Sequence, residues 1–216
     1  EVNRYVYDQL REWGQRTGRR QTPRLLSPGL EGDMPLLVAD VPTAAVAAPP
    51  AAGLGKRSPY RILLAKDAIP AERTAAEELQ RYLVKIGGAE LPIEEEKPGM
   101  AVPEHAILVG PGSAVRQLAP DVDWSNLPRE MMVQRSVGPR LILAGGRPRG
   151  TLYAVYELLD RQYGIRWITP DVEVVPQTKS LVLPRLAVQR QPAVEYRDLL
   201  FGALADPAWA ARNRLN

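Results

Sequence analysis

Cysteine is absent from the 216 residues, and histidine occurs only once, at His105. The lack of thiols excludes disulfides, zinc–thiolate centres and cysteine nucleophiles. A single imidazole excludes any site that needs two histidines, and we predict neither a metal nor an organic cofactor. No apolar run approaches the roughly 18 residues that a membrane-spanning helix needs, so we predict no membrane partner.

The overall composition is that of a globular chain, with 45% hydrophobic and 25% charged residues. The net charge is +3, and arginines are frequent before residue 25. Such a basic arm could bind nucleic acid, or it could belong to a solvated helix and linker. We favour the second interpretation because no aromatic ladder or nucleic-acid motif accompanies the arginines, and we predict no nucleic-acid partner.

The first quarter of the chain differs from the rest. Apolar side chains at near-helical spacing predict a short helix over 3–14. Residues 15–34 are typical of a linker, 35–41 of a strand, and 42–59, rich in Ala, Pro and Gly, of a loop. Since the chain begins with Glu1 and no leader follows, we expect a fragment or a processed form.

Stronger patterns begin at residue 60. We predict helices over 71–86, 113–118 and 150–163, and strands over 60–65, 91–95, 106–109, 131–137, 140–145, 165–168, 172–175 and 180–183. The Gly138-Pro139 turn joins two apolar runs and indicates a hairpin, so part of the sheet should be antiparallel. The fold class is therefore α+β, with two main helices on one face of a mixed or antiparallel sheet.

Two glycine-rich turns stand where a phosphate could bind. In the turn over 145–150 the glycines have the spacing of a phosphate-binding loop, but Thr151 replaces its lysine. In the turn that begins at 110, Val115 replaces the third glycine of the dinucleotide fingerprint. We interpret both turns as structural, with Gly150 letting the following helix pack close to the sheet.

Catalytic candidates are few. His105 lies at the mouth of a predicted strand and has no second histidine to work with, so we interpret it as a surface or edge residue. Three adjacent acids, Glu94–Glu96, precede a lysine and a proline. That pattern indicates a solvated strand end and not the separated carboxylate pair of a glycosidase.

Several stretches occur in an order that carries a family resemblance: AERTAAEELQRYLVKIGGAELPI, ILVGPG, LILAGGRPRGTLYAVYELLDRQYGIRWITP, QPAVEYRD and ARNRLN. Over 56–216 they resemble the N-terminal region of bacterial glycoside-hydrolase-like proteins related to family-67 α-glucuronidases and family-20 β-N-acetylhexosaminidases. The resemblance implies an accessory domain with the hexosaminidase-domain-2 fold, followed by a (β/α)8 catalytic barrel. It also implies that Arg147, Arg149 and Tyr153 lie in a loop and helix that pack towards that barrel.

The resemblance divides the chain into an N-terminal helix and linker (1–55), the accessory domain (56–190) and the truncated start of the barrel (191–216). The first barrel strand would be 192–198, and an arginine of this strand binds the sugar in family-20 enzymes. Arg197 matches it, although Asp198 replaces the usual glycine, so both are candidate substrate contacts. The alternative is an Arg197 that pairs with Glu195 or Asp198.

A strand without its barrel neighbours should be poorly anchored. We therefore expect the apolar side chains of this segment to face water or to find a substitute partner: Val194, Leu199, Leu200, Phe201, Trp209 and Leu215.

The resemblance implies a non-catalytic accessory domain that positions a glycoside hydrolase barrel lying outside this chain. Carbohydrate would be bound through that barrel, the chain alone would be inactive, and the location would be secreted or periplasmic. The alternative is a free-standing carbohydrate-binding or protein-interaction module. Its aromatic platform would come from Tyr153, Tyr163 or Trp167, although a place in the core or at the barrel interface suits these residues better.

Overall fold

The computed structural model describes residues 53–55, 58–197 and 206–215. All of them belong to one compact unit, residues 47–216. The helix predicted at 3–14, the linker at 15–34 and the strand at 35–41 lie outside the described residues, as does Asp198. None of the helices within the described ranges is long and apolar enough to cross a membrane.

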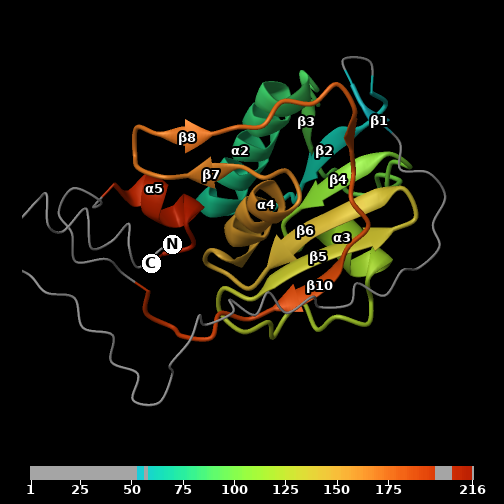
Figure 1. Cartoon of the computed structure of the whole chain (residues 1–216). Helices are drawn as coiled ribbons and strands as arrows, with labels where there is room; N and C mark the ends of the chain where they lie inside the picture. The colour runs from blue at the N-terminus through green and yellow to red at the C-terminus, as the bar shows by residue number, and fades with distance from the viewer. Residues whose placement is uncertain (1–52, 56–57, 198–205, 216) are drawn as a thin grey trace, which may run out of the picture. The chain divides into compact units, whose positions relative to one another are not determined.

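The domain is built on a six-stranded sheet (Figure 1). Its strands, in spatial order, are β10 (Ala187–Arg190), β5 (Met132–Val137), β6 (Arg140–Gly145), β4 (Ala106–Val109), β2 (Arg61–Leu64) and β3 (Ile93–Glu95). β3, β2, β4 and β6 run parallel, whereas β5 is antiparallel to both β6 and β10. The sheet is therefore mixed, and the predicted hairpin at Gly138-Pro139 is confirmed by the pairing of β5 with β6.

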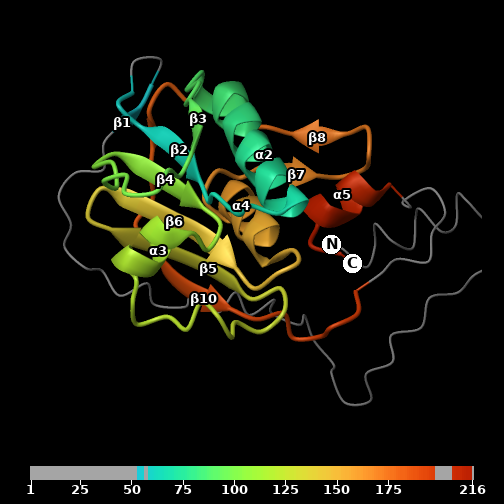
Figure 2. The same ribbon diagram turned by 180° about the vertical axis from the view of Figure 1, so that it is seen from behind.

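The two main helices are α2 (Pro70–Gly87) and α4 (Gly150–Arg161), and both cover the same face of the sheet, as predicted. Successive side chains along a strand point to opposite faces of the sheet. Ile62 and Leu64 point into the core shared with α2 and α4, whereas Leu63 points into a second core. That second core is covered by the short helix α3 (Ser113–Leu118), seen from behind in Figure 2.

Sequence signals at both ends explain the bounds of α2. Pro70 occupies the first turn, where its missing N–H costs nothing. The Glu72 carboxylate accepts a hydrogen bond from the Ile69 N–H, 3.0 Å away, which satisfies an N–H that has no partner within the helix. Gly88, with φ of 69°, ends the helix in the left-handed conformation that favours glycine.

Short strands accompany the main sheet. β7 (Arg166–Trp167) pairs with β8 (Glu173–Val174), and β1 (Gly53–Leu54) pairs with β9 (Leu181–Val182). The loop predicted at 42–59 is thus wrong at 53–54, because β9 supplies a partner that local composition does not reveal. β10 was not predicted either, and residues 191–197 form no strand. The first barrel strand was expected at 192–198. Its described part, 192–197, is not a strand, because no other described strand lies beside it to pair with.

The C-terminal residues pack onto the domain through α5 (Pro207–Arg212). Trp209 is 6% exposed and belongs to the core shared with α2 and α4, and Leu215 packs against that core. Of the two alternatives expected for these residues, exposure to water and a substitute partner, the structure shows the second, because α4 and β7 provide the partner. Val194, by contrast, is 58% exposed, as expected, and Leu199, Leu200 and Phe201 lie outside the described residues.

Candidate functional site

The glycine-rich turn between β6 and α4 is closed by backbone contacts. A Cβ atom on Gly150 would lie 2.4 Å from the carbonyl oxygen of Met131, and one on Gly145 would lie 2.2 Å from the same oxygen. Both positions need glycine because the backbone of the preceding segment passes too close for a side chain. The turn joins strand to helix by close packing, as the sequence indicates.

The second glycine-rich turn holds a carboxylate of the chain itself. Glu96 accepts hydrogen bonds from the backbone N–H groups of Ser113 and Ala114, 2.9 and 3.1 Å away, at the start of α3. A Cβ atom on Gly112 would lie 2.5 Å from Oε1 of Glu96. The place where a phosphate would bind is thus filled. The solvated strand end predicted for Glu94–Glu96 is wrong at Glu96, which is buried, although Glu94 and Glu95 pair with exposed arginines.

Arg147, expected in a barrel-packing loop, binds the start of α2. Its Nε lies 3.0 Å from Oε1 of Glu72, and its Nη2 lies 3.1 Å from Oδ2 of Asp67. Hydrogen bonding to the fully buried Glu72 raises the pKa of the Arg147 guanidinium. Arg147 therefore ties the β6–α4 turn to α2.

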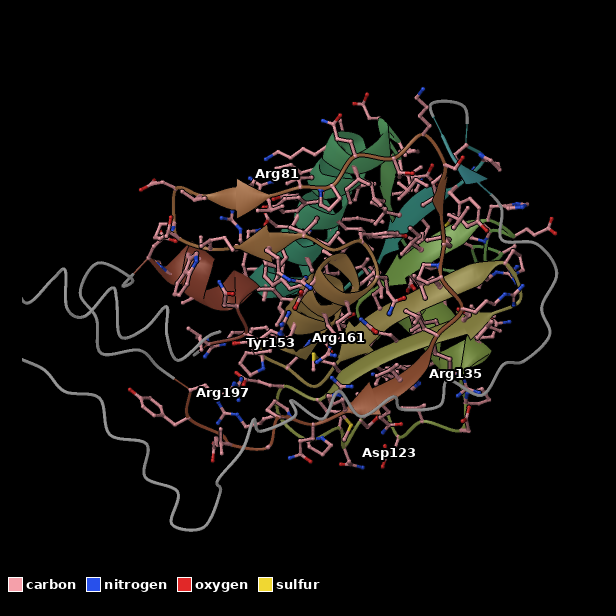
Figure 3. The ribbon with its side chains drawn as sticks, viewed as in Figure 1. Arg81, Asp123, Arg135, Tyr153, Arg161 and Arg197 are labelled. Atoms are coloured by element: carbon pink, nitrogen blue, oxygen red, sulfur yellow. The ribbon has the colours of Figure 1, made fainter. Side chains whose placement is uncertain are left out.

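Arg149 and Arg197 both pair with one buried acid, Glu130, and Tyr153 lies against the two arginines (Figure 3 labels Tyr153 and Arg197). Nε of Arg149 lies 3.2 Å from Oε1 of Glu130, and Nη2 of Arg197 lies 2.6 Å from Oε2. Both guanidinium carbons lie over the ring of Tyr153, 6.0 and 5.7 Å from its centroid. Arg149, Tyr153 and Arg197 thus form one cluster, the Glu130 cluster, from which Arg147 stands apart.

Glu130 is unusual in both backbone and environment. Its φ is 59°, a backbone conformation that residues other than glycine seldom adopt, and the residue is 5% exposed. Its N–H donates to the carbonyl oxygen of Gly146, 3.1 Å away. The β6–α4 turn therefore helps to hold Glu130 in the position where its carboxylate meets both arginines.

Tyr153 is almost fully buried under the two arginines. Its hydroxyl donates to the carbonyl oxygen of Leu215, 2.8 Å away. Burial raises the pKa of this hydroxyl, and the nearby Glu130 carboxylate raises it further. Tyr153 stays protonated at neutral pH and joins α4 to the C-terminal segment, so it offers no exposed platform for a sugar.

Arg197 directs its side chain into the domain. Nε donates to the carbonyl oxygen of Arg214 at 2.8 Å, and Nη1 donates to that of Val194 at 2.6 Å. Among the described residues its ion pair is with Glu130, and it contacts the backbone carbonyl oxygen of Glu195 at 3.3 Å; Asp198, the other partner considered, lies outside those residues. In this arrangement Arg197 holds the segment 194–197 in place, and its role as a substrate contact stays a prediction.

A second buried acid, Glu157 of α4, is surrounded by arginines. Nε of Arg161 and Nη1 of Arg190 both lie 2.7 Å from its Oε1, and Nε of Arg214 lies 3.4 Å from its Oε2. Arg214 also pairs with Asp160, 2.6 Å away. We call these residues the Glu157 cluster. It adjoins the Glu130 cluster through Arg214, whose carbonyl oxygen binds Arg197.

A groove of about 420 Å³ lies between the ends of α2 and α4 and the segment that carries β9. No charged side chain of the described residues lines it; its walls are Ile86, Gln162, Tyr163, Pro176, Thr178, Ser180, Leu181, Val182 and Pro184. Tyr163, which is half-buried, donates a hydrogen bond from its hydroxyl to the carbonyl oxygen of Val182, 3.1 Å away. The volume of this groove is within the range of small-molecule binding sites.

Neither Glu130 nor Glu157 was predicted as a site residue. Each stands alone between residues of other types, and its arginine partners come from distant segments, so no local pattern could indicate it. Among the described residues, no group of three or more His, Asp or Glu side chains is arranged to hold a metal ion. The site is therefore an ion-pair system between α4 and the C-terminal segment.

Comparison with known proteins gives a structural likeness. No protein-family model matches the chain, and no curated protein resembles it in sequence. A solved family GH115 4-O-methyl-α-glucuronidase, with specificity for decorated arabinogalactans, resembles it with a TM-score of 0.45 and 17% identity. The match covers 65% of this chain and 18% of that enzyme. The chain therefore matches less than a fifth of that enzyme's length.

Proposed function

We propose that this domain is a non-catalytic accessory domain of a glycoside hydrolase, which packs against a catalytic barrel and positions it. The anchored segment 194–197 carries the proposal. Glu130 and the domain backbone hold Arg197, while its neighbours Val194 and Tyr196 are 58% and 74% exposed. An accessory domain needs exposed side chains, held in place, that another domain can cover.

The buried acids also support a non-catalytic role. Four glutamates are buried in the described residues: Glu72, Glu96, Glu130 and Glu157. Arginines bind three of them, and the start of α3 binds the fourth. A glycosidase instead needs two carboxylates flanking an open cleft. The chemistry would then belong to the barrel, with carbohydrate as its substrate.

Two measurements test this proposal. The chain should show no turnover of aryl glycosides or glucuronides, and turnover that survives purification and is lost on mutating one of its residues would contradict the proposal. The reading frame should also continue beyond Asn216 with the strand–helix alternation of a barrel, which typically needs about 250 residues. A stop codon directly after Asn216 would instead favour a free-standing module.

The groove beside Tyr163 supports a second candidate, a carbohydrate-binding module. Its described lining residues are uncharged and combine an aromatic ring with hydroxyl and amide groups, which suits a neutral sugar. Tyr153 and Trp167 are buried and could not serve as the platform. Isothermal titration with neutral oligosaccharides, using Tyr163→Ala as the variant, tests this candidate. Binding that Tyr163→Ala leaves unchanged would reject the groove.

A further inference from the structure

The Glu157 cluster contains more positive than negative charge. Arg161, Arg190 and Arg214 approach one carboxylate, and Arg161 and Arg190 share a single oxygen of it. Asp160 adds a second carboxylate but also binds Arg166. Among the described residues, four guanidinium groups thus surround two carboxylates, which leaves an excess of two positive charges. Because arginine does not deprotonate in proteins, this excess persists at every physiological pH.

The outer arginines also keep hydrogen-bond donors available. A guanidinium carries five N–H donors. Within the described ranges, Arg161 uses Nε and Arg190 uses Nη1, and their side chains are 59% and 44% exposed. Nη1 of the inner Arg214 is buried and meets no acceptor among the described residues. The cluster therefore combines unbalanced charge with unused donors at the surface.

Two arginines that share one carboxylate oxygen must hold their guanidinium groups close together. Glu157 is 4% exposed, so both arginines are anchored to a carboxylate that lies in the interior of the domain. An incoming carboxylate would relieve the repulsion between the two cations and accept hydrogen bonds from both. Figure 3 places Arg161 on α4, while Arg190 reaches the same acid from β10.

We propose that Arg161 and Arg190 form a binding site for the carboxylate groups of an acidic polysaccharide. The choice of a polysaccharide rests on the proposed function. Single-stranded nucleic acid is disfavoured because its binding usually needs exposed aromatic rings for stacking, and the aromatic residues of α4, Tyr153 and Tyr156, are buried. The site would let the domain hold an acidic glycan while a separate barrel acts on it.

Titration of the whole chain with polygalacturonate tests this site. Arg161→Gln/Arg190→Gln should weaken binding about tenfold or more, because each hydrogen bond to a charged group is lost. Arg116→Gln/Arg135→Gln is the matched control: it removes the same charge, and Figure 3 shows Arg135 well apart from Arg161. This control should bind almost normally, and dextran, which is neutral, should not bind.

Several outcomes would overturn the proposal: no binding of polygalacturonate, equal loss in both double variants, tighter binding of duplex DNA at the same salt concentration, or stronger competition by phosphate than by galacturonate. Circular dichroism establishes that each variant is folded. Should the double variant unfold, Arg161→Gln alone decides, since its side chain is 59% exposed. Failure here leaves the accessory-domain proposal intact, because that depends on the reading frame and on the absence of turnover.

Discussion

The indole nitrogen of Trp209 lies 3.0 Å from the backbone carbonyl oxygen of Trp167 and donates a hydrogen bond to it. The two residues belong to α5 and β7, and each is almost fully buried. Trp167 in turn meets the rings of Tyr82 and Tyr156 edge-on, with centroids 5.6 and 5.4 Å apart. Through this contact the C-terminal helix becomes part of the main core.

Replacing Trp209 should therefore destabilise the whole domain. We expect Trp209→Ala to lower the free energy of unfolding by about 3 kcal/mol, because it removes a large buried side chain and leaves a cavity. Urea unfolding followed by far-ultraviolet circular dichroism measures the change. Val194→Ala, at a 58% exposed position, should change it by less than about 0.5 kcal/mol. Equal effects of the two variants would show that α5 does not pack as described.

Glu130 should anchor the chain before α5. We expect Glu130→Gln to cost about 2 kcal/mol, because it leaves Arg149 and Arg197 without their carboxylate; partial exposure of Arg149 keeps the cost below that of a fully buried pair. Amide exchange should accelerate over 194–197. Glu95→Gln, which breaks an exposed pair with Arg73, should have almost no effect. Unchanged protection at 194–197 would contradict the anchoring role.

The close backbone approach at Gly150 gives a prediction about the β6–α4 turn. Gly150→Ala should destabilise the domain by about 3 kcal/mol or prevent folding, because its Cβ atom would lie 2.4 Å from a carbonyl oxygen. Gly55→Ala is the control, since no atom lies within 4 Å of the added carbon. Thermal melting distinguishes the two. A stable Gly150→Ala protein would mean that the turn does not need glycine there.

Acid should loosen the β7–β8 hairpin through Glu173. Partial burial alone would raise the pKa of this carboxyl, but hydrogen bonds from Lys85 and Tyr82 outweigh it and lower the pKa below its ordinary value of 4.5. A lowered pKa in the folded state means that the stabilisation is present above pH 4.5 and is lost as pH falls through the folded value.

Urea unfolding between pH 6 and pH 3 tests this linkage. Glu173→Gln should reduce stability at pH 6 and make its decline in acid less steep. Glu90→Gln is the control, because it removes the same charge at an exposed position. A decline in acid as steep in Glu173→Gln as in the unchanged protein would show that other carboxylates cause it.

Much of the architecture follows from local patterns. Alternating and continuous apolar runs predicted β2, β4, β5 and β6, and the two amphipathic stripes predicted α2 and α4 on one face. These signals are local because side-chain period and burial are linked within each element. Thr151, which stands in place of the lysine of a phosphate-binding loop, likewise excludes that loop by its identity alone.

The ion-pair clusters depend on distant segments, so the sequence alone could not indicate them. Glu130 meets Arg197 across 67 positions, and Glu157 meets Arg190 across 33. Any of the chain's many arginines could have been the partner, because charge has no period that identifies a contact. The same holds for Glu96, whose burial depends on where α3 begins.

The sequence by itself determined the fold class, the positions of the main helices and strands, and the absence of thiol and multi-histidine chemistry. Only the tertiary structure decided that α5 packs into the core and that Arg147, Arg149 and Arg197 form ion pairs with buried acids. The physical reason is that secondary structure is specified by neighbours along the chain. Burial of Trp209 and pairing of Glu130 are instead specified by neighbours in space, which exist only once the sheet and its helices have assembled.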